Sequence, residues 1–92
     1  MTVKSMFDFK FPSKHATEGV ALAHAVGADM TAKAGYLDHE IISDVKDAGH
    51  VMVNTHWESE DAANAVLEPY QHDDKITQAT KLIGSAPTGF VG

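Results

Sequence analysis

The side chains of this sequence that are best able to do chemistry lie close together at residues 54–59, NTHWES, which include its only tryptophan. A histidine can act as a general base near neutral pH, and the indole of Trp57 could wall an apolar pocket. The same tryptophan could equally fill a core, because its large area dominates packing wherever it lies. The two interpretations differ in what surrounds Trp57, so the elements that carry it come next.

Two alternations of apolar and polar residues, at 36–45 and 50–57, predict neighbouring antiparallel strands joined by a tight turn. Apolar residues occupy odd positions in both segments, so odd positions must face each other. A three-residue loop over residues 47–49, with Gly49 in a left-handed conformation, satisfies this condition. The expected register places His39 opposite Trp57, Ile41 opposite Thr55 and Ser43 opposite Val53.

This register divides residues 54–59 between two faces of the sheet. Thr55 and Trp57 share one face with His39, which is therefore a candidate base beside an aromatic wall. On the other face we expect Glu40 opposite His56 and Ile42 opposite Asn54. One histidine and one carboxylate fall short of the three protein ligands of a catalytic zinc, so no metal site is expected.

The remaining segments complete an α+β pattern. Residues 3–11 alternate as a strand that has Phe7 and Phe9 on its apolar side. Glycine, proline and capping residues then divide the rest of the chain into helices and a final strand. We expect a helix from an N-cap at Ser13 to about residue 34 that Gly35 ends, a second capped by Ser59 and interrupted near Leu67 by Pro69, a third over residues 74–83 under an aspartate cap, and a short strand in residues 87–92.

The order strand, helix, strand, strand, helix, strand predicts a ferredoxin-like βαββαβ fold in a single domain, residues 1–92. Such a chain forms a four-stranded antiparallel sheet with helices on one face. The other face stays open, and we expect a second copy to cover it, sheet against sheet, so that the homodimer forms an α+β barrel. The residues expected on this dimer face are Met6, Glu40, Ile42, Met52, Asn54 and His56.

The composition excludes several classes of function. The net charge is −6 and none of the 7 basic residues is an arginine, so a nucleic-acid-binding surface is not expected. No apolar run approaches the ~20 residues of a membrane span, and the first residues alternate instead of forming a signal-peptide block, so a cytoplasmic protein is expected. Without cysteine the chain has no disulfide, thiolate metal site or cysteine nucleophile.

Residues 35–66, GYLDHEIISDVKDAGHVMVNTHWESEDAANAV, resemble the antibiotic biosynthesis monooxygenase family of small dimeric α+β barrel proteins. The likeness in topology extends over about residues 3–85. The family's first helix histidine falls here at Leu67 or Glu68, and the first strand lacks the asparagine of haem-degrading members, so haem is not expected. The matching positions are Gly35, Asp47, Trp57, Ser59 and His72, for the family's glycine, turn aspartate, tryptophan, helix cap and second helix histidine.

The resemblance implies an activity as well as a fold. Enzymes of this family use molecular oxygen on an electron-rich aromatic substrate, without metal or flavin, in a pocket between the sheet and its helices. For this chain it implies no cofactor and a small aromatic or quinone-like ligand, with His39 or His72 as the catalytic base that removes a proton from the substrate. The substrate-binding residues would be Phe7, Phe9, Thr55 and Trp57.

A second hypothesis uses the same residues differently. In a non-catalytic dimeric module that binds a small ligand or regulates, these side chains would fill the core instead of lining a chamber. The feature that separates the two hypotheses is the space between Trp57 and the second helix, which is either open or filled.

Overall fold

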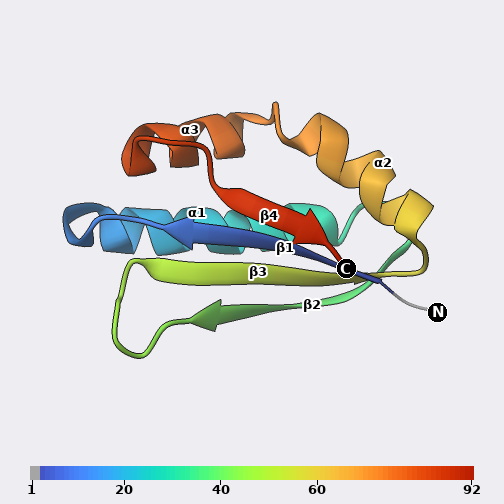
Figure 1. Cartoon of the computed structure of the whole chain (residues 1–92), viewed down its shortest axis with the longest axis horizontal. Coiled ribbons are helices and arrows are strands. Elements are labelled where there is room, and N and C mark those ends of the chain that lie inside the picture. Colours follow the sequence, from blue (N-terminus) through green and yellow to red (C-terminus); the bar gives the residue numbers. More distant parts are fainter. Residues whose placement is uncertain (1–2) are drawn as a thin grey trace.

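The computed structural model describes residues 3–92, so residues 1 and 2 of the expected domain lie outside the described part. Figure 1 shows strands and helices in the expected alternation. The second half of the chain carries two helices before the last strand, as its capping signals predicted. The elements are β1 (Val3–Lys10), the 3₁₀ helix η1 (Ser13–His15), α1 (Ala16–Met30), β2 (Tyr36–Ser43), β3 (His50–Trp57), α2 (Glu60–Tyr70), α3 (Asp74–Ile83) and β4 (Thr88–Val91).

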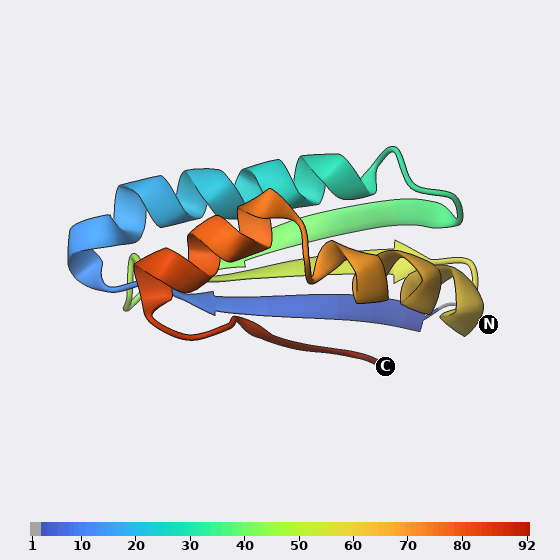
Figure 2. The same ribbon diagram turned by 90° about the horizontal axis from the view of Figure 1, so that it is seen from above.

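The four strands form one antiparallel sheet in the order β2-β3-β1-β4, which is the predicted ferredoxin-like arrangement. Figure 2 shows α1 running along the sheet, with α2 and α3 following one another beside it. β1 and β3 are the central strands, and β4, which pairs with β1 alone, is one edge. No helix within residues 3–92 is both long enough and apolar enough to cross a membrane.

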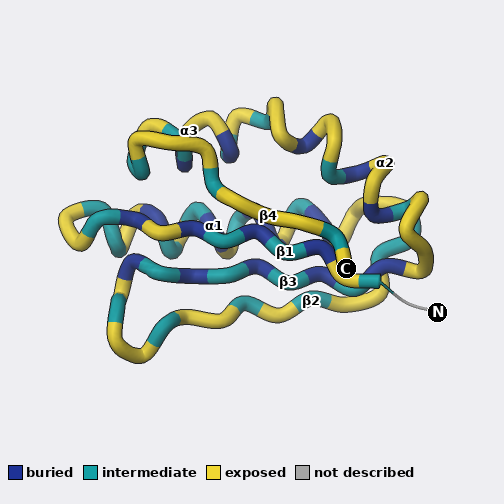
Figure 3. Tube along the Cα trace, in the orientation of Figure 1, coloured by how far each residue is buried: buried dark blue, intermediate teal, exposed yellow. Residues whose placement is uncertain are grey.

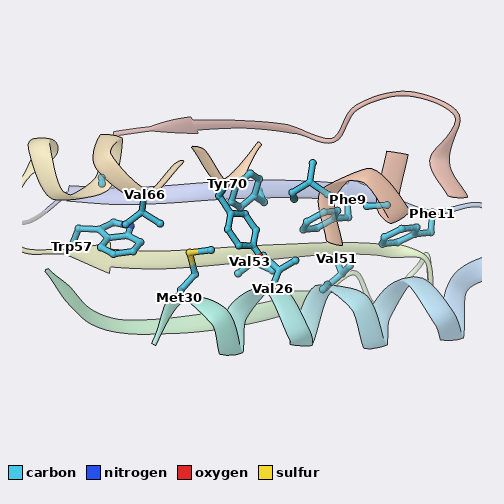
Figure 4. Packing of buried hydrophobic residues seen from close by; sticks show 14 residues of the cluster. Phe9, Phe11, Val26, Met30, Val51, Val53, Trp57, Val66 and Tyr70 are labelled. Atoms are coloured by element: carbon cyan, nitrogen blue, oxygen red, sulfur yellow. The ribbon is translucent and has the colours of Figure 1, made fainter. Parts of the chain in front are cut away.

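The core lies between the odd-numbered side chains of the central strands and the helices. Strand β3 alternates strictly between buried and half-buried residues, and Figure 3 shows this alternation along the chain trace. All three α-helices contribute buried side chains to the same cluster, so all three cover the same face of the sheet. Figure 4 shows this cluster, which includes Phe9, Phe11, Val26, Met30, Val51, Val53, Trp57, Val66 and Tyr70.

The register between β2 and β3 differs from the expected one by two residues. His39 pairs with Thr55, Ile41 with Val53 and Ser43 with Val51, while Trp57 lies opposite Tyr36. From Asp38 to Ser43 odd positions still oppose odd positions, so these side chains lie on the faces predicted for them. A bulge between Tyr36 and Asp38 then sets the even-numbered Tyr36 opposite Trp57, and Leu37, predicted on the buried face, is exposed. The two-residue shift in register arises because the loop is longer than the expected residues 47–49. Strand β2 ends at Ser43, and the backbone N–H of Asp44 donates to the carbonyl of His50 at 2.9 Å.

Within this loop, aspartate side chains stabilise the turns, a role that was expected of a glycine in the left-handed conformation. Asp44 accepts a hydrogen bond from the N–H of Lys46 at 2.8 Å, and Asp47 accepts one from the N–H of Gly49 at 3.0 Å. Gly49 does not have a positive φ, which corrects the prediction. It is instead tightly packed, because a Cβ there would lie 2.1 Å from the carbonyl oxygen of Phe11. Val45, expected in the strand, is 98% exposed in the loop.

The helix boundaries confirm some of the predicted signals and correct others. Ser59 and Asp73 cap α2 and α3 by accepting backbone hydrogen bonds from Ala62 and Lys75, and α3 ends at Gly84 with φ +93°. The Ser13 side chain makes no capping bond, because a 3₁₀ turn precedes α1. Helix α1 ends at Met30, and a turn leads to Gly35 with φ +86°.

The predicted interruption of α2 by Pro69 is absent. The helix continues through it to Tyr70, and the backbone carbonyl of Leu67 accepts a hydrogen bond from the N–H of Gln71 at 3.2 Å. The proline lies in the last turn of the helix, so it removes one backbone donor there without breaking the whole element.

Candidate functional site

A cleft of about 820 Å³ opens between the β1–β4 edge of the sheet and the helices α2 and α3. The floor is formed by β1, one side by the facing surface of α2 and α3, and the other side by the C-terminal segment that leads into β4. The lining is apolar at its base and polar along α2. The residues that line it are Met6, Phe7, Asn64, Leu67, Glu68, Gln71, His72, Ile76, Thr80, Ala86, Pro87, Thr88, Gly89, Phe90 and Val91.

The structure brings two of the six predicted pocket residues to this cleft. Phe7 reaches it from the odd face of β1, and His72 reaches it from the turn between α2 and α3. The other four, Phe9, Thr55, Trp57 and His39, do not line it. The cleft is therefore displaced from the tryptophan toward the strand β4.

The space around Trp57 is filled. Its side chain has 0% exposed surface, and its Nε1 donates a 2.9 Å hydrogen bond to Oγ of Ser5, which is also buried. The edge of the Tyr36 ring packs against the indole with the ring centroids 6.3 Å apart and the planes at 82°. In Figure 4, Trp57 lies at one end of the core, near Met30 and Val66. Trp57 is thus a packing residue in this chain.

His39 lies on the edge strand β2, where its ring centroid is 5.8 Å from that of Tyr36. Its Nδ1 forms a 2.7 Å hydrogen bond with the hydroxyl of Tyr36. The imidazole packs against α1 at Gly27, where an added Cβ would lie 3.1 Å from Cδ2 of the ring. Gly27 therefore leaves room for the half-buried histidine, which lies outside the lining of the cleft beside β4.

The end of α2 positions His72. Gln71 continues the helical conformation beyond Tyr70, and the N–H of His72 donates to the carbonyl of Pro69 at 3.1 Å. The chain then turns into α3 under its Asp73 cap. His72 also lines a smaller hollow of about 290 Å³ beside Tyr70, so its exposed imidazole can be reached from two sides.

A half-buried polar bridge links α1 to the helices α2 and α3 that form the wall of the cleft. The hydroxyl of Tyr70 donates to Oδ2 of Asp29 on α1 at 2.8 Å, and Nζ of Lys75 on α3 lies 2.9 Å from the same oxygen. Burial raises the pKa of the Asp29 carboxyl, but the hydrogen bonds from Lys75 and Tyr70 outweigh it and the net change in pKa is downward. Burial, followed by the carboxylate of Asp29, raises the pKa of the Tyr70 phenol.

Sequence reasoning missed the polar wall of the cleft. Asn64, Leu67, Glu68 and Gln71 recur at spacings of three and four, so they share one face of α2. That spacing was readable in the sequence. What was not readable is that residues 86–91 return to close the opposite side, because this depends on β4 pairing with β1.

The predicted dimer residues lie on the open face, in rows across the sheet. Glu40, Asn54 and Met6 form one row, and Phe90 of β4 extends it with 64% of its surface exposed. Ile42 and Met52 form the next row. The partner of His56 is Asp38 instead of the expected Glu40, because of the two-residue shift in register. Oδ1 of Asn54 is buried and finds no hydrogen-bond partner within residues 3–92.

One charged cluster on this face was not predicted. His50 lies between two carboxylates, with Nε2 2.8 Å from Asp8 and Nδ1 3.1 Å from Asp44. Hydrogen bonds that the ring donates to Asp44 and then to Asp8 raise the pKa of the imidazole. The cluster links the strand β1 to the loop before β3 through Asp8 and Asp44. Within residues 3–92 no group of three or more histidine, aspartate or glutamate side chains could hold a metal ion.

Comparison with known proteins gives the class that this fold and cleft define. The sequence profile of the antibiotic biosynthesis monooxygenase family matches residues 2–73, and the chain belongs to that family. A search of curated proteins finds no match.

Solved structures with the same fold cover almost the whole chain. A conserved protein from Methanosarcina mazei Go1 has a TM-score of 0.81 at 6% identity, over 100% of this chain and 91% of that one. Rv0793 from Mycobacterium tuberculosis has a TM-score of 0.80 at 14% identity, over 100% and 93%. SnoaB from Streptomyces nogalater, described as a cofactor-independent oxygenase, has a TM-score of 0.70 at 16% identity, over 99% and 88%. At these identities the likeness establishes the fold alone.

Proposed function

We propose that this protein is a cofactor-independent monooxygenase that oxidises a small aromatic or quinone-like molecule in the cleft beside β4. The observation that carries the proposal is the cleft itself, which has room for a bicyclic aromatic ring and includes an imidazole, His72, in its lining. Phe7 and Ile76 offer the ring an apolar surface, and the family and the description of SnoaB supply the class of reaction.

The proposed chemistry needs one base and no bound electron carrier. For 1-naphthol as a probe, His72 removes the hydroxyl proton and leaves an anion with charge at ring carbon C4. C4 bonds to molecular oxygen, and the resulting peroxide takes the proton back from His72. Loss of the C4 proton and cleavage of the O–O bond then release water. The products are 1,4-naphthoquinone and water, and the four electrons that the ring loses are those that oxygen gains.

Oxygen uptake and quinone formation with 1-naphthol test the proposal. We expect His72→Ala to lower turnover about 100-fold or more, because general-base catalysis typically contributes at least that factor. His24→Ala is the matched control, since His24 is exposed on α1 and does not line the cleft. His39→Ala is a further arm. Loss of turnover in His39→Ala with normal turnover in His72→Ala would contradict the assignment of the base.

We also propose that the active species is a homodimer formed through the open face of the sheet. Support comes from the apolar groups exposed there, Ile42 and Phe90 among them, and from the unpaired Oδ1 of Asn54. We expect light scattering at micromolar concentration to give about twice 9.9 kDa. Ile42→Asp should yield the monomeric mass, whereas Ala21→Asp, an exposed position on α1, should leave the dimer intact. A monomeric wild type would contradict the proposal.

A non-catalytic ligand-binding module is the second candidate, and one observation favours it. Trp57 is buried in the core and His39 lies outside the cleft. Of the two candidate bases, only His72 lines the cleft. If 1-naphthol binds without oxygen uptake in the wild type, and His39→Ala and His72→Ala bind it equally well, the module is the better description.

A further inference from the structure

The fixed charge in the lining of the cleft is negative only. Glu68 is its one acidic side chain, and among residues 3–92 no lysine lines it, in a chain that contains no arginine at all. A ligand with a carboxylate, sulfonate or phosphate would therefore meet one like charge and no fixed cation. Lys75 on α3 does not line the cleft and is paired with Asp29 of α1.

The position of Glu68 strengthens this effect. It lies in the last turn of α2, which ends at Tyr70, so the carbonyl end of the helix dipole adds partial negative charge to its own. The ion pairs formed within residues 3–92 all join other residues, so no cation neutralises the Glu68 carboxylate. At the start of α3, where the helix end is positive, Asp73 and Asp74 supply offsetting negative charge.

We infer that the cleft selects by charge, accepting uncharged or cationic aromatic ligands and rejecting anionic ones, and that Glu68 is the residue that sets this preference. The inference rests on the proposed function only in taking the cleft as the ligand site. It narrows the substrate class to aromatic molecules that carry their polarity as neutral hydroxyl or carbonyl groups. Aromatic carboxylates, sulfonates and acyl groups carried on phosphorylated carriers fall outside that class.

Three probes with the same bicyclic ring test the inference. They are 1-naphthol, which is neutral, 1-naphthoate, an anion, and 1-naphthylmethylammonium, a cation. Titrations followed by NMR shifts of cleft residues such as Ile76 and Thr80 give each dissociation constant and its location. In the wild type we expect 1-naphthoate to bind about fivefold or more weakly than 1-naphthol, the factor for one partly screened like charge, with the cation at least equal to 1-naphthol.

Variants assign the preference to its residue. Glu68→Gln should remove most of the discrimination against 1-naphthoate, and Glu68→Lys should reverse it. Glu60→Gln makes the same change in the first turn of α2, outside the cleft, and should leave the ratio of dissociation constants unchanged. All the variants are compared at the same ionic strength, because added salt screens the effect.

The outcomes separate this inference from the proposed function. Equal binding of the three probes, or a preference for 1-naphthoate, would overturn charge selection while leaving the cleft as the ligand site. An unchanged preference in Glu68→Gln would overturn the role of Glu68. No shift of cleft residues with any probe would overturn the proposed function and this inference together.

Discussion

Nε1 of Trp57 donates a 2.9 Å hydrogen bond to Oγ of Ser5, and both side chains are buried where β1 meets β3. The bond satisfies the one polar atom of the indole, so the ring can be sealed in the core without an unpaired donor.

Ser5→Ala should therefore destabilise the fold by about 1–3 kcal/mol, the typical cost of leaving a buried donor unpaired. Urea unfolding followed by the fluorescence of Trp57 measures the loss. Ser43→Ala, at an exposed serine on β2, is the control and should change stability by less than about 0.5 kcal/mol. Equal effects of the two substitutions would mean that the Ser5 hydroxyl is not needed to satisfy the indole.

Stability should depend on pH through His50. Both ring nitrogens face carboxylate oxygens, and both can donate only in the protonated form. Because the folded pKa is raised, the stabilisation is fully present below the unfolded pKa of about 6.5 and is lost as pH rises through the folded pKa. The charged groups facing the ring are Asp8, Lys10, which lies two residues further along β1 and pairs directly with His50, and Asp44 from the loop.

Unfolding experiments from below pH 6.5 to above the folded pKa of His50, on the wild type and on His50→Gln, check the direction of this pH dependence. At pH 6 we expect the wild type to have a larger free energy of unfolding than His50→Gln. This difference in stability should shrink as pH rises. His24→Gln, at an exposed histidine, should show no such trend. A difference that grows with pH would refute the charged bridge.

Gly19→Ala should destabilise the protein although alanine favours a helix. A Cβ at Gly19 would lie 2.3–2.6 Å from three atoms of the Phe11 ring, which is itself almost fully buried. The expected overpacking cost of about 1–3 kcal/mol outweighs the gain of about 1 kcal/mol in helix propensity. Ala21→Gly, at an exposed position of the same helix, measures the propensity term alone. A net gain in melting temperature for Gly19→Ala would show that Phe11 can move aside at little cost.

The two serines predicted as helix caps should respond differently to the same substitution. Ser59→Ala removes the acceptor of the Ala62 N–H and should cost about 1 kcal/mol. Ser13→Ala removes no capping bond, because the Ser13 side chain makes none, and should be nearly neutral. Thermal unfolding of the two variants beside the wild type distinguishes them. Equal losses would indicate that Ser13 caps α1 in solution.

The sequence by itself determined the class of fold and the face that each residue of β3 occupies. Period-two alternation puts Thr55 and Trp57 on one face and Asn54 and His56 on the other, whatever the register. Ser59 and Gly84 mark helix ends through local backbone chemistry, which needs no distant partner. The family likeness followed from such local positions and is confirmed over residues 2–73.

Only the tertiary structure decided the register of β2 and the place of the cleft. The pairing of His39 with Thr55 depends on turns that Asp44 and Asp47 form in the loop, and several loop lengths preserve the same alternation. The cleft joins Phe7, Glu68 and Phe90, which are far apart in the chain and meet only because β4 pairs with β1 beneath α2 and α3. Local patterns carry no information about such long-range contacts, so the sequence could name Trp57 but not what it touches.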